Sequence, residues 1–412
     1  MNVFPLDVIK KTILESQRLS GFEKHRTKSP TVTILRVIDR IRALQIDTLQ
    51  MVRRSHYLAL WSRIDNYSTD LLDELCYGKN KKFLEYWYHA ACIIPISEFP
   101  YRKPHMKIHE RMKSRRWNEW GSLESNRALA ENVFNIIQNE GPQKTSNFNN
   151  SDKKRGPWWD WKPQKRALEY LYDSGKVIIS DRVNFQRVYD DTEKYIPKDM
   201  ISKSVSMEES ILHDLEKSLI ATGICSHQQV ADYTHMKRNT AKPHLIKLIE
   251  QGIAVEITGI NSSGHQQEFL IHKNNLELLH KISEGGYMAQ RTTLLSPFDS
   301  LFWARGRDVT IFGFDQVLEC YKPKNMRKWG YFSLPILHNG NLVGRLDPKL
   351  DRVSKTLFIR SLHLEEKVDP TERLVKDTAN ALKRFLEFHE VKNIAFDKIG
   401  NQNFNKKLEG EF

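Results

Sequence analysis

The chain has 412 residues, enough for two to four domains of ordinary size, and 40% of them are hydrophobic. This composition supports packed cores and excludes wholesale disorder. Lysine and arginine outnumber aspartate and glutamate by 64 to 51, and the net charge of +13 favours a nucleic-acid partner.

The sequence also limits the cellular setting. Its first residues hold no apolar run long enough for a secretory signal, and no stretch approaches the ~18 to 20 apolar residues of a membrane span. An anionic membrane surface would suit the charge, but we find no lipidation motif and no basic amphipathic helix. The 4 cysteines are scattered without a Cys-x-x-Cys pair, which argues against a disulfide framework or a zinc ribbon. We expect a cytoplasmic protein.

The first part of the chain shows helices followed by a short β element, the outline of a winged helix. Helical spacing marks residues 6–20, with Gly21 as a stop, and Ser29-Pro30 is expected to open a second helix. Residues 57–64 are helical again. The aromatic segment 83–96 is typical of a strand pair or wing.

The same order of helix, helix and wing recurs twice. In the second copy we expect helices over 124–139 and from Pro163, and a hairpin over 177–189. In the third, helices at 208–221 and 239–251 precede two strand-like segments. The expected domains are winged-helix modules at 1–120, 121–205 and 206–285, followed by a small β-rich domain at 286–412.

The character of the sequence changes at Leu294. Asp299 is expected to cap a short helix, and strand-like segments separated by turns follow it. A closing helix is expected over 371–391, with a polar tail after Asn401. The predicted fold class is therefore mostly α with β wings, an α+β chain of tandem winged-helix modules.

The triplet Gln45-Ile46-Asp47 is the strongest candidate for a reactive site. In an extended segment, residues two apart share a face, so an amide and a carboxylate would lie together with Ile46 behind them. Taken alone, however, Asp47 is better explained as a helix cap, because Asp47 and Gln50 have the spacing of a capping box. The two roles are compatible, since a carboxylate held by backbone N–H groups is both positioned and kept ionised.

Other catalytic machinery is missing from the sequence. It contains no phosphate-binding loop, no nucleophile elbow and no zinc-deaminase signature. The 15 histidines show no metal-ligand spacing, and a nuclease would need clustered carboxylates for metals. An enzyme here would work with carboxylate, amide and water, and we expect no metal and no cofactor.

Several motifs in chain order resemble the crosslink-repair DNA glycosylase family of YcaQ and AlkZ. After Gln45-Ile46-Asp47 they are R-S-H-Y-L-A-L-W-S-R at 54–63, E-Y-W-Y-H-A-A at 85–91, W-W-D-W-K-P-Q-K-R-A-L-E-Y-L at 158–171, L-L-S-P-F-D-S-L at 294–301, F-G-F-D-Q-V-L-E-C-Y at 312–321 and K-W-G-Y-F-S-L-P-I-L at 328–337. The resemblance implies a C-shape of winged helices around duplex DNA. It also implies hydrolysis of the N-glycosidic bond of N7-alkylated purines, including some interstrand crosslinks.

The chemistry of that reaction fits the triplet. The sugar becomes oxocarbenium-like as the bond breaks, and a nearby carboxylate stabilises that charge and orients or deprotonates the attacking water. Asp47 is expected in that role, and Gln45 would hold the water or contact the deoxyribose. With Asp47 in the third position, the chain is similar to the branch with the wider substrate range. No lysine stands in the triplet, so we expect a monofunctional glycosylase.

Basic and aromatic side chains would supply affinity for double-stranded DNA that carries alkylated or crosslinked purines. Contacts that position the DNA are expected from Arg53, Arg54, Ser55, His56, Arg63, Lys153, Arg155, Lys162, Lys165 and Arg166. The residues expected near the lesion are Tyr57, Tyr86, Trp87 and His89. The three tryptophans of the 158–161 segment could lie in the core or face DNA.

The competing interpretation is a winged-helix transcription regulator or architectural protein without catalysis. Such proteins usually carry one winged-helix module with a dimerisation or ligand domain. Three modules, the charge surplus and the Gln-x-Asp pair count against it. We expect a monomer that associates with the nucleoid when bound to DNA.

Overall fold

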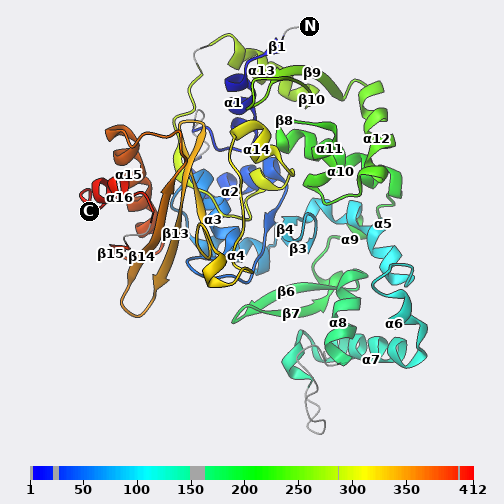
Figure 1. The fold of residues 1–412 in the computed structure, drawn as a ribbon. Helices are drawn as coiled ribbons and strands as arrows, with labels where there is room; N and C mark the ends of the chain where they lie inside the picture. The colour runs from blue at the N-terminus through cyan, green and yellow to red at the C-terminus, as the bar shows by residue number, and fades with distance from the viewer. Residues whose placement is uncertain (1–2, 22–26, 149–162, 286, 398–399) are drawn as a thin grey trace. The chain divides into compact units, whose positions relative to one another are not determined.

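The computed structural model describes residues 3–21, 27–148, 163–285, 287–397 and 400–412 (Figure 1). Helices and strands are interspersed along these residues, which confirms the expected combination of the two. The chain divides into two compact units. Unit 1 comprises Met1–Thr69, Trp87–Ile93 and Asp214–Phe412, and unit 2 comprises Asp70–Tyr86 and Ile94–His213.

One sheet of unit 1 joins the start of the chain to a segment far along it. Its strands, in spatial order, are β1 (Val3–Phe4), β9 (Ala254–Ile260), β10 (Gln266–His272) and β8 (Ile224–Cys225). The β1 strand runs parallel to β9, and the other pairs are antiparallel. The associated helices are α1 (Leu6–Ser16), α10 (Met207–Thr222), α11 (His227–Tyr233), α12 (Arg238–Glu250), α13 (Leu276–Ser283) and α14 (Arg307–Phe312). Ile9 and Ile13 of α1 share an apolar core with Phe269 of β10.

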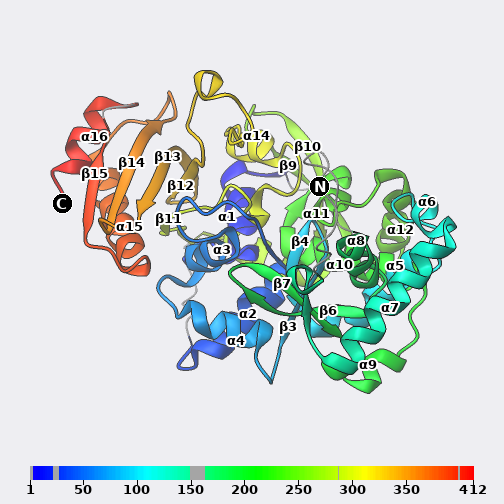
Figure 2. The same ribbon diagram turned by 90° about the horizontal axis from the view of Figure 1, so that it is seen from below.

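The second sheet of unit 1 forms the C-terminal part of the chain. Its five strands, in spatial order, are β11 (Thr292–Leu294), β12 (Leu334–His338), β13 (Asn341–Asp351), β14 (Thr356–Leu364) and β15 (Asn393–Phe396). All neighbours are antiparallel except β14 and β15. Figure 2 shows this sheet with α15 (Glu372–Phe388) and α16 (Gln402–Glu409) beside it. The buried face of α15, including Leu382 and Phe385, packs into the core of this part.

The segment with the triplet lies in unit 1 between two helices, α2 (Pro30–Ile41) and α3 (Ser55–Ile64). The Ser29 hydroxyl accepts a hydrogen bond from the Val32 N–H, and Pro30 occupies the first turn, which confirms the predicted helix start. Strand β2 (Leu44–Gln45) follows α2 and pairs antiparallel with β4 (Ala91–Pro95). This short pairing fixes the backbone that carries Gln45.

Unit 2 combines helices with a three-stranded sheet in the order β5-β7-β6. Its elements are α4 (Thr69–Tyr77), β3 (Phe83–Trp87), α5 (Phe99–Glu110), α6 (Asn118–Ser122), α7 (Glu124–Glu140), β5 (Gln143–Lys144), α8 (Pro163–Asp173), β6 (Val177–Val183), β7 (Gln186–Asp191) and α9 (Lys198–Ser202). The predicted helices at 124–139 and from Pro163, and the hairpin at 177–189, are confirmed. Trp117 is buried, and its indole N–H donates to Asp173.

Two predicted boundaries are wrong. The first helix ends at Ser16 rather than Ser20, because Arg18 adopts a left-handed φ of 58° and the Leu19 N–H bonds back to the Leu14 carbonyl. The segment after Asn401 is a helix, α16, rather than a polar tail. Its two apolar side chains, Phe404 and Leu408, are fully buried in the core beneath α15.

Candidate functional site

Strand β2 ends at Gln45, the first residue of the triplet Gln45-Ile46-Asp47, and one further backbone bond continues its pairing to Ile46. Gln45 pairs with Cys92 of β4, and the Ile46 N–H donates to the Ala91 carbonyl at 2.8 Å. The Ile46 side chain is buried, whereas its two polar neighbours are half-buried. Burial therefore alternates over the three residues, with Ile46 in the core and both Gln45 and Asp47 partly accessible.

Asp47 is held by the backbone that follows it. Its Oδ1 atom accepts a hydrogen bond from the Leu49 N–H at 2.8 Å. The next helix begins only at Ser55, and the Gln50 side chain accepts from Arg54 rather than closing a capping box. The interpretation of Asp47 as a helix cap is therefore wrong, and the carboxylate closes a local turn instead.

Different parts of the Asp47 environment shift the pKa of its carboxyl in opposite directions. Burial raises the pKa of the Asp47 carboxyl above its ordinary value, while the N–H groups of Leu49 and Thr48 and the charge of Arg54 lower it. The Arg54 guanidinium itself donates to the Thr48 carbonyl at 2.9 Å. Asp47 thus combines partial desolvation with fixed donors, an arrangement that suits a carboxylate used in chemistry.

The loop after Asp47 is tied to the C-terminal part of unit 1. The Leu350 N–H donates to the Met51 carbonyl at 2.8 Å, and Arg352 donates to the Val52 carbonyl at 3.0 Å. The Arg53 side chain donates to Phe388 O at 3.0 Å and to Glu390 at 2.9 Å, at the end of α15. Through these bonds the Arg53 guanidinium fixes the loop. The position of Arg53 is therefore explained without a contact to phosphate.

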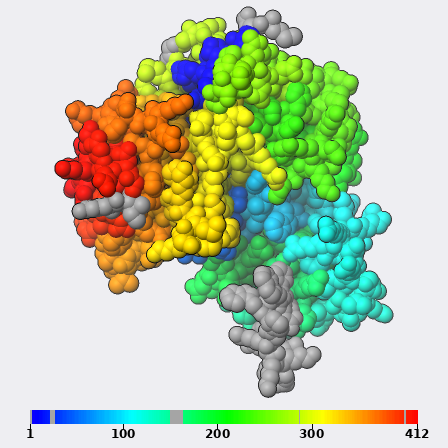
Figure 3. Space-filling view, in the orientation of Figure 1, coloured from blue at the N-terminus to red at the C-terminus, as the bar shows by residue number. Residues whose placement is uncertain are grey.

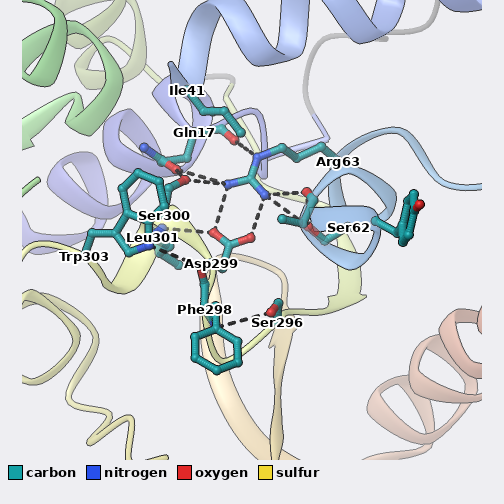
Figure 4. Close-up of polar contacts among 12 residues, drawn as sticks. Gln17, Ile41, Ser62, Arg63, Ser296, Phe298, Asp299, Ser300, Leu301 and Trp303 are labelled. Carbon is teal, nitrogen blue, oxygen red and sulfur yellow. Dashed lines mark hydrogen bonds and ion pairs between the residues drawn. The ribbon is translucent and has the colours of Figure 1, made fainter. Parts of the chain in front are cut away.

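Arg63, predicted to contact DNA, lies in the interior (Figure 4). Its guanidinium forms a two-pronged ion pair with Asp299, at 2.6 and 2.9 Å, and donates to the Gln17 carbonyl at 2.8 Å. Both side chains of the pair are fully buried. The prediction for Arg63 is wrong because its charge is compensated inside the fold, where no phosphate can reach it.

Asp299 has a second role that the sequence did predict. Its Oδ1 atom accepts from the Leu301 N–H at 2.9 Å and caps the short helix Ser300–Phe302. Figure 4 shows this turn and Arg63 in one hydrogen-bonded group with Gln17. The group connects three segments that are far apart in the sequence.

Ser55 and His56 stand at the start of α3 and are both buried, so the prediction that they contact DNA is wrong for this structure. The Ser55 hydroxyl instead donates to the Gln45 carbonyl at 2.6 Å. The His56 ring lies 4.1 Å from the ring of Tyr57, which is half-buried. The start of α3 therefore holds the backbone of Gln45 in place through this hydrogen bond.

The residues predicted near the lesion differ in their burial and contacts. Tyr86 is buried within unit 2, where its hydroxyl donates to the Asp173 carbonyl, so a lesion contact by Tyr86 is wrong. Trp87 is half-buried. His89 stacks on Trp303 with ring centroids 4.7 Å apart. Burial, with a smaller effect from His235, lowers the pKa of His89 to about 4, so the ring is neutral at physiological pH.

The second group of predicted DNA contacts is only partly described. Lys165 is half-buried and Arg166 exposed, both in the first turn of α8. Lys153, Arg155, Lys162 and the three tryptophans of the 158–161 segment lie outside the described residues.

The sequence reasoning missed the loop at 319–330, whose charge and aromatic content were a usable signal. Tyr321 is followed by Lys322, Lys324, Arg327 and Lys328, a run of cations around an aromatic residue. Burial raises the pKa of the Cys320 thiol, and the negative charge of Asp47 adds a smaller contribution to that rise.

The described residues offer neither a metal-binding cluster nor a membrane-spanning helix. Within them, no group of three or more histidine, cysteine, aspartate or glutamate side chains is placed to hold a metal ion. Among the same residues, none of the helices is both long and apolar enough to cross a membrane.

Comparison with known proteins identifies what this arrangement is similar to. The sequence model of the family described as "DNA glycosylase AlkZ-like" matches residues 38–388. Among solved structures, the Streptomyces sahachiroi DNA glycosylase AlkZ is similar, with a TM-score of 0.65 and 14% sequence identity. The match covers 96% of this chain and 100% of that one.

Proposed function

The chain belongs to the AlkZ-like DNA glycosylase family, and from this premise we propose that it hydrolyses the N-glycosidic bond of N7-alkylated purines in duplex DNA. The proposal includes purines joined in interstrand crosslinks. The observation that carries it is the Gln45-Ile46-Asp47 segment at the end of β2, with its carboxylate half-buried and held by backbone donors.

The reaction asks little of a general acid. An N7-alkylated purine already carries a positive charge, so it departs as a neutral base. The sugar develops oxocarbenium character as the bond breaks, and the Asp47 carboxylate stabilises that charge electrostatically. Asp47 also accepts a proton from the attacking water or orients it toward the sugar carbon.

Gln45 is half-buried, as Asp47 is, and its amide carries both a donor and an acceptor. We assign it to the water or to a deoxyribose oxygen. The triplet has no amine that could form a Schiff base with the sugar, so the product is an abasic site in an unbroken strand. Arg54, next to Asp47, together with Lys165 and Arg166 would contact phosphates.

The test is incubation of the protein with duplex DNA that holds N7-methylguanine or a nitrogen-mustard crosslink, followed by alkali to cleave abasic sites. Wild type should release the base, and Asp47→Asn should lose release by at least a hundredfold while still binding the duplex. Asp7→Asn, at an exposed carboxylate on α1, is the matched control and should retain full activity.

Binding should weaken steeply with salt, because several phosphate contacts release counterions. Salt-sensitive binding by wild type without base release from either substrate would overturn the enzyme proposal and favour a DNA-binding regulator. Full activity in Asp47→Asn would remove Asp47 from the mechanism.

A further inference from the structure

Two exposed basic side chains lie against each other where α11 meets the segment before α14. The Arg305 guanidinium is 3.5 Å from the Nε2 atom of His235, which stands in the turn between α11 and α12. The two segments also touch through Gln229 of α11, whose amide donates to the Arg305 carbonyl at 3.4 Å. Figure 3 shows the yellow segment around α14 beside the green segment of α11 and α12 at the surface of unit 1.

Carboxylates are missing around this contact in the described part of the chain. Within the described residues, none lies within ion-pair distance of Arg305 or of Lys237, an exposed residue two positions after His235. Arg238 differs, because its guanidinium pairs with Asp232 at 2.9 Å. An exposed arginine that stands beside a second basic group instead of a carboxylate favours an anionic ligand, which would compensate its charge.

Stacked aromatic rings hold His235 in place. The buried Trp303 ring is nearly parallel to the His89 ring, with centroids 4.7 Å apart, and the His235 ring stacks on His89 at 5.3 Å. The His235 Nδ1 atom donates to the His89 carbonyl at 3.0 Å, which leaves Nε2 toward Arg305. The His89 Nδ1 atom is itself bonded to the Asp232 carbonyl at 3.1 Å. The His235 ring is therefore fixed before any ligand binds.

The backbone of His235 has a conformation that is usual for glycine. Its φ is 57°, and the Met236 N–H donates to the Ala231 carbonyl at 2.9 Å, which closes the end of α11. Glycine is the commonest residue in such a turn, because a Cβ is disfavoured at positive φ. The turn therefore gives no reason for a histidine, whereas the contacts of its ring to His89 and Arg305 do.

The same contacts join this surface to the strand that positions the triplet. His89 lies two residues before Ala91, the first residue of β4, and the Ala91 carbonyl accepts the Ile46 N–H at 2.8 Å. His235 is bonded to the carbonyl of His89 itself. A ligand bound at Arg305 would thus be held by the same short segment, within unit 1, that holds the backbone of the triplet.

We propose that Arg305, positioned by His235, binds a phosphate of the DNA backbone close to the damaged base, with Lys237 adding positive charge at the same surface. This inference rests on the proposed glycosylase function and adds a DNA contact outside the triplet. The planar guanidinium matches two phosphate oxygens with parallel N–H donors. Phosphate contacts fix the register of a duplex without reading its sequence, so Arg305 would place the strand relative to Asp47 without selecting the lesion.

The test measures the affinity of the full chain for an undamaged duplex at several salt concentrations. Each phosphate contact adds about 0.9 to the slope of log affinity against log salt, so Arg305→Gln should reduce the slope by about that amount and weaken binding by roughly tenfold at low salt. Arg305→Lys keeps the charge and should keep most of the slope.

His235→Asn tests the positioning role, because asparagine tolerates the left-handed backbone while the ring is lost. Alone it should weaken binding less than Arg305→Gln does. In the double variant it should add no further loss, since His235 acts through Arg305. Additive losses would remove His235 from the proposal and show that its effect does not pass through Arg305.

Arg373→Gln is the matched control, because it also removes one exposed cation of unit 1, and Arg373 already pairs with Asp377 at 3.6 Å on α15. Its slope should equal that of wild type. A wild-type slope in Arg305→Gln, or equal losses in the two arginine variants, would overturn the phosphate contact. Failure of wild type to release N7-methylguanine is a separate outcome that refutes the proposed function, and the slopes would still decide whether Arg305 binds a phosphate.

Discussion

The Ser55 hydroxyl donates a 2.6 Å hydrogen bond to the Gln45 carbonyl, so the first residue of α3 is joined to the strand that carries the candidate catalytic pair. Ser55 is buried, and its partner lies on the main chain rather than on a side chain. This bond makes the position of Gln45 depend on α3, which is itself anchored near its other end by the Arg63–Asp299 pair.

Replacing Ser55 by alanine should therefore reduce both stability and catalysis. Loss of the bond costs about 1–3 kcal/mol, because a part-buried carbonyl loses its donor. We expect the single-turnover rate of base release to fall by roughly tenfold with little change in duplex affinity, since a displaced amide no longer positions the water. Ser55→Thr keeps the hydroxyl and should recover most of the rate. Equal rates for wild type and Ser55→Ala would show that the bond does not position the site.

The rate of base release should depend on the ionisation of Asp47. Burial raises the pKa of its carboxyl above the ordinary value, and the reaction needs the carboxylate. Activity should fall as the pH drops through this raised pKa. Arg54 opposes the rise, so Arg54→Gln should move the acid limb of the single-turnover profile to higher pH. Circular dichroism at each pH distinguishes titration from unfolding, and an unshifted limb would separate Arg54 from Asp47.

The buried ion pair between Arg63 and Asp299 should be costly to break on one side only. Arg63→Met leaves an uncompensated carboxylate in the interior, and we expect a loss of about 3–5 kcal/mol in the free energy of unfolding. Urea denaturation measures this loss. Replacing both partners, in Arg63→Met/Asp299→Leu, should recover part of it. The surface pair of Asp7 and Lys11 is the comparison, because Asp7→Asn should cost about 0–1 kcal/mol.

A loss for Arg63→Met no larger than for Asp7→Asn would contradict the burial seen for the pair. Binding of undamaged duplex by the double variant offers an independent check. If Arg63 is internal, that affinity should equal the wild-type value.

Helix α16, at the end of the chain, should contribute to the free energy of unfolding although most of its residues are polar. Phe404 and Leu408 of α16 are fully buried against α15, and the Asn401 side chain caps the helix by accepting from the Phe404 N–H. Phe404→Ala should cost about 3–5 kcal/mol in the free energy of unfolding, measured in urea. Phe412→Ala is the control, because Phe412 is 45% exposed. Equal losses in the two variants would contradict the packing of α16.

Some features of the fold and of the candidate site could be predicted from local sequence signals alone. The start of α2 was predictable because Ser29 and Pro30 satisfy the first turn by themselves, and the hairpin of β6 and β7 because its alternation is local. The alternating burial of the triplet was predictable for the same reason, because polar, apolar and polar residues in turn are typical of one strand.

Other features depend on partners that no local pattern reveals. Ser55, His56 and Arg63 were expected at a DNA surface because polar residues are usually exposed, but α3 is buried on most sides. The partners of Ser55 and Arg63 are Gln45, Gln17 and Asp299, and nothing in the sequence pairs those positions. The α16 helix was missed because two apolar residues four apart give too weak a periodic signal.

The stability of unit 1 should fall in acid because of His389, a buried histidine at the end of α15. Its Nε2 atom accepts from the Arg53 N–H at 3.1 Å, and its Nδ1 lies 2.7 Å from the Phe385 carbonyl, an arrangement for a neutral ring. Burial lowers the pKa of His389 to about 3. The unfolded chain, with a histidine pKa of about 6.5, therefore binds more protons between these values, and stability falls as the pH drops.

We expect the His389 contribution to be fully present above pH ~6.5 and to decline by about 1.4 kcal/mol per pH unit as the pH falls toward about 3. Other histidines also titrate, so the quantity to measure is the difference in urea unfolding free energy between wild type and His389→Gln. That difference should shrink from pH 7 to pH 5, because the variant has no imidazole to protonate. The same substitution at the exposed His265 is the control. A difference that stays constant over this range would show that His389 is protonated equally in the folded and unfolded chain, which the two hydrogen bonds to its ring argue against.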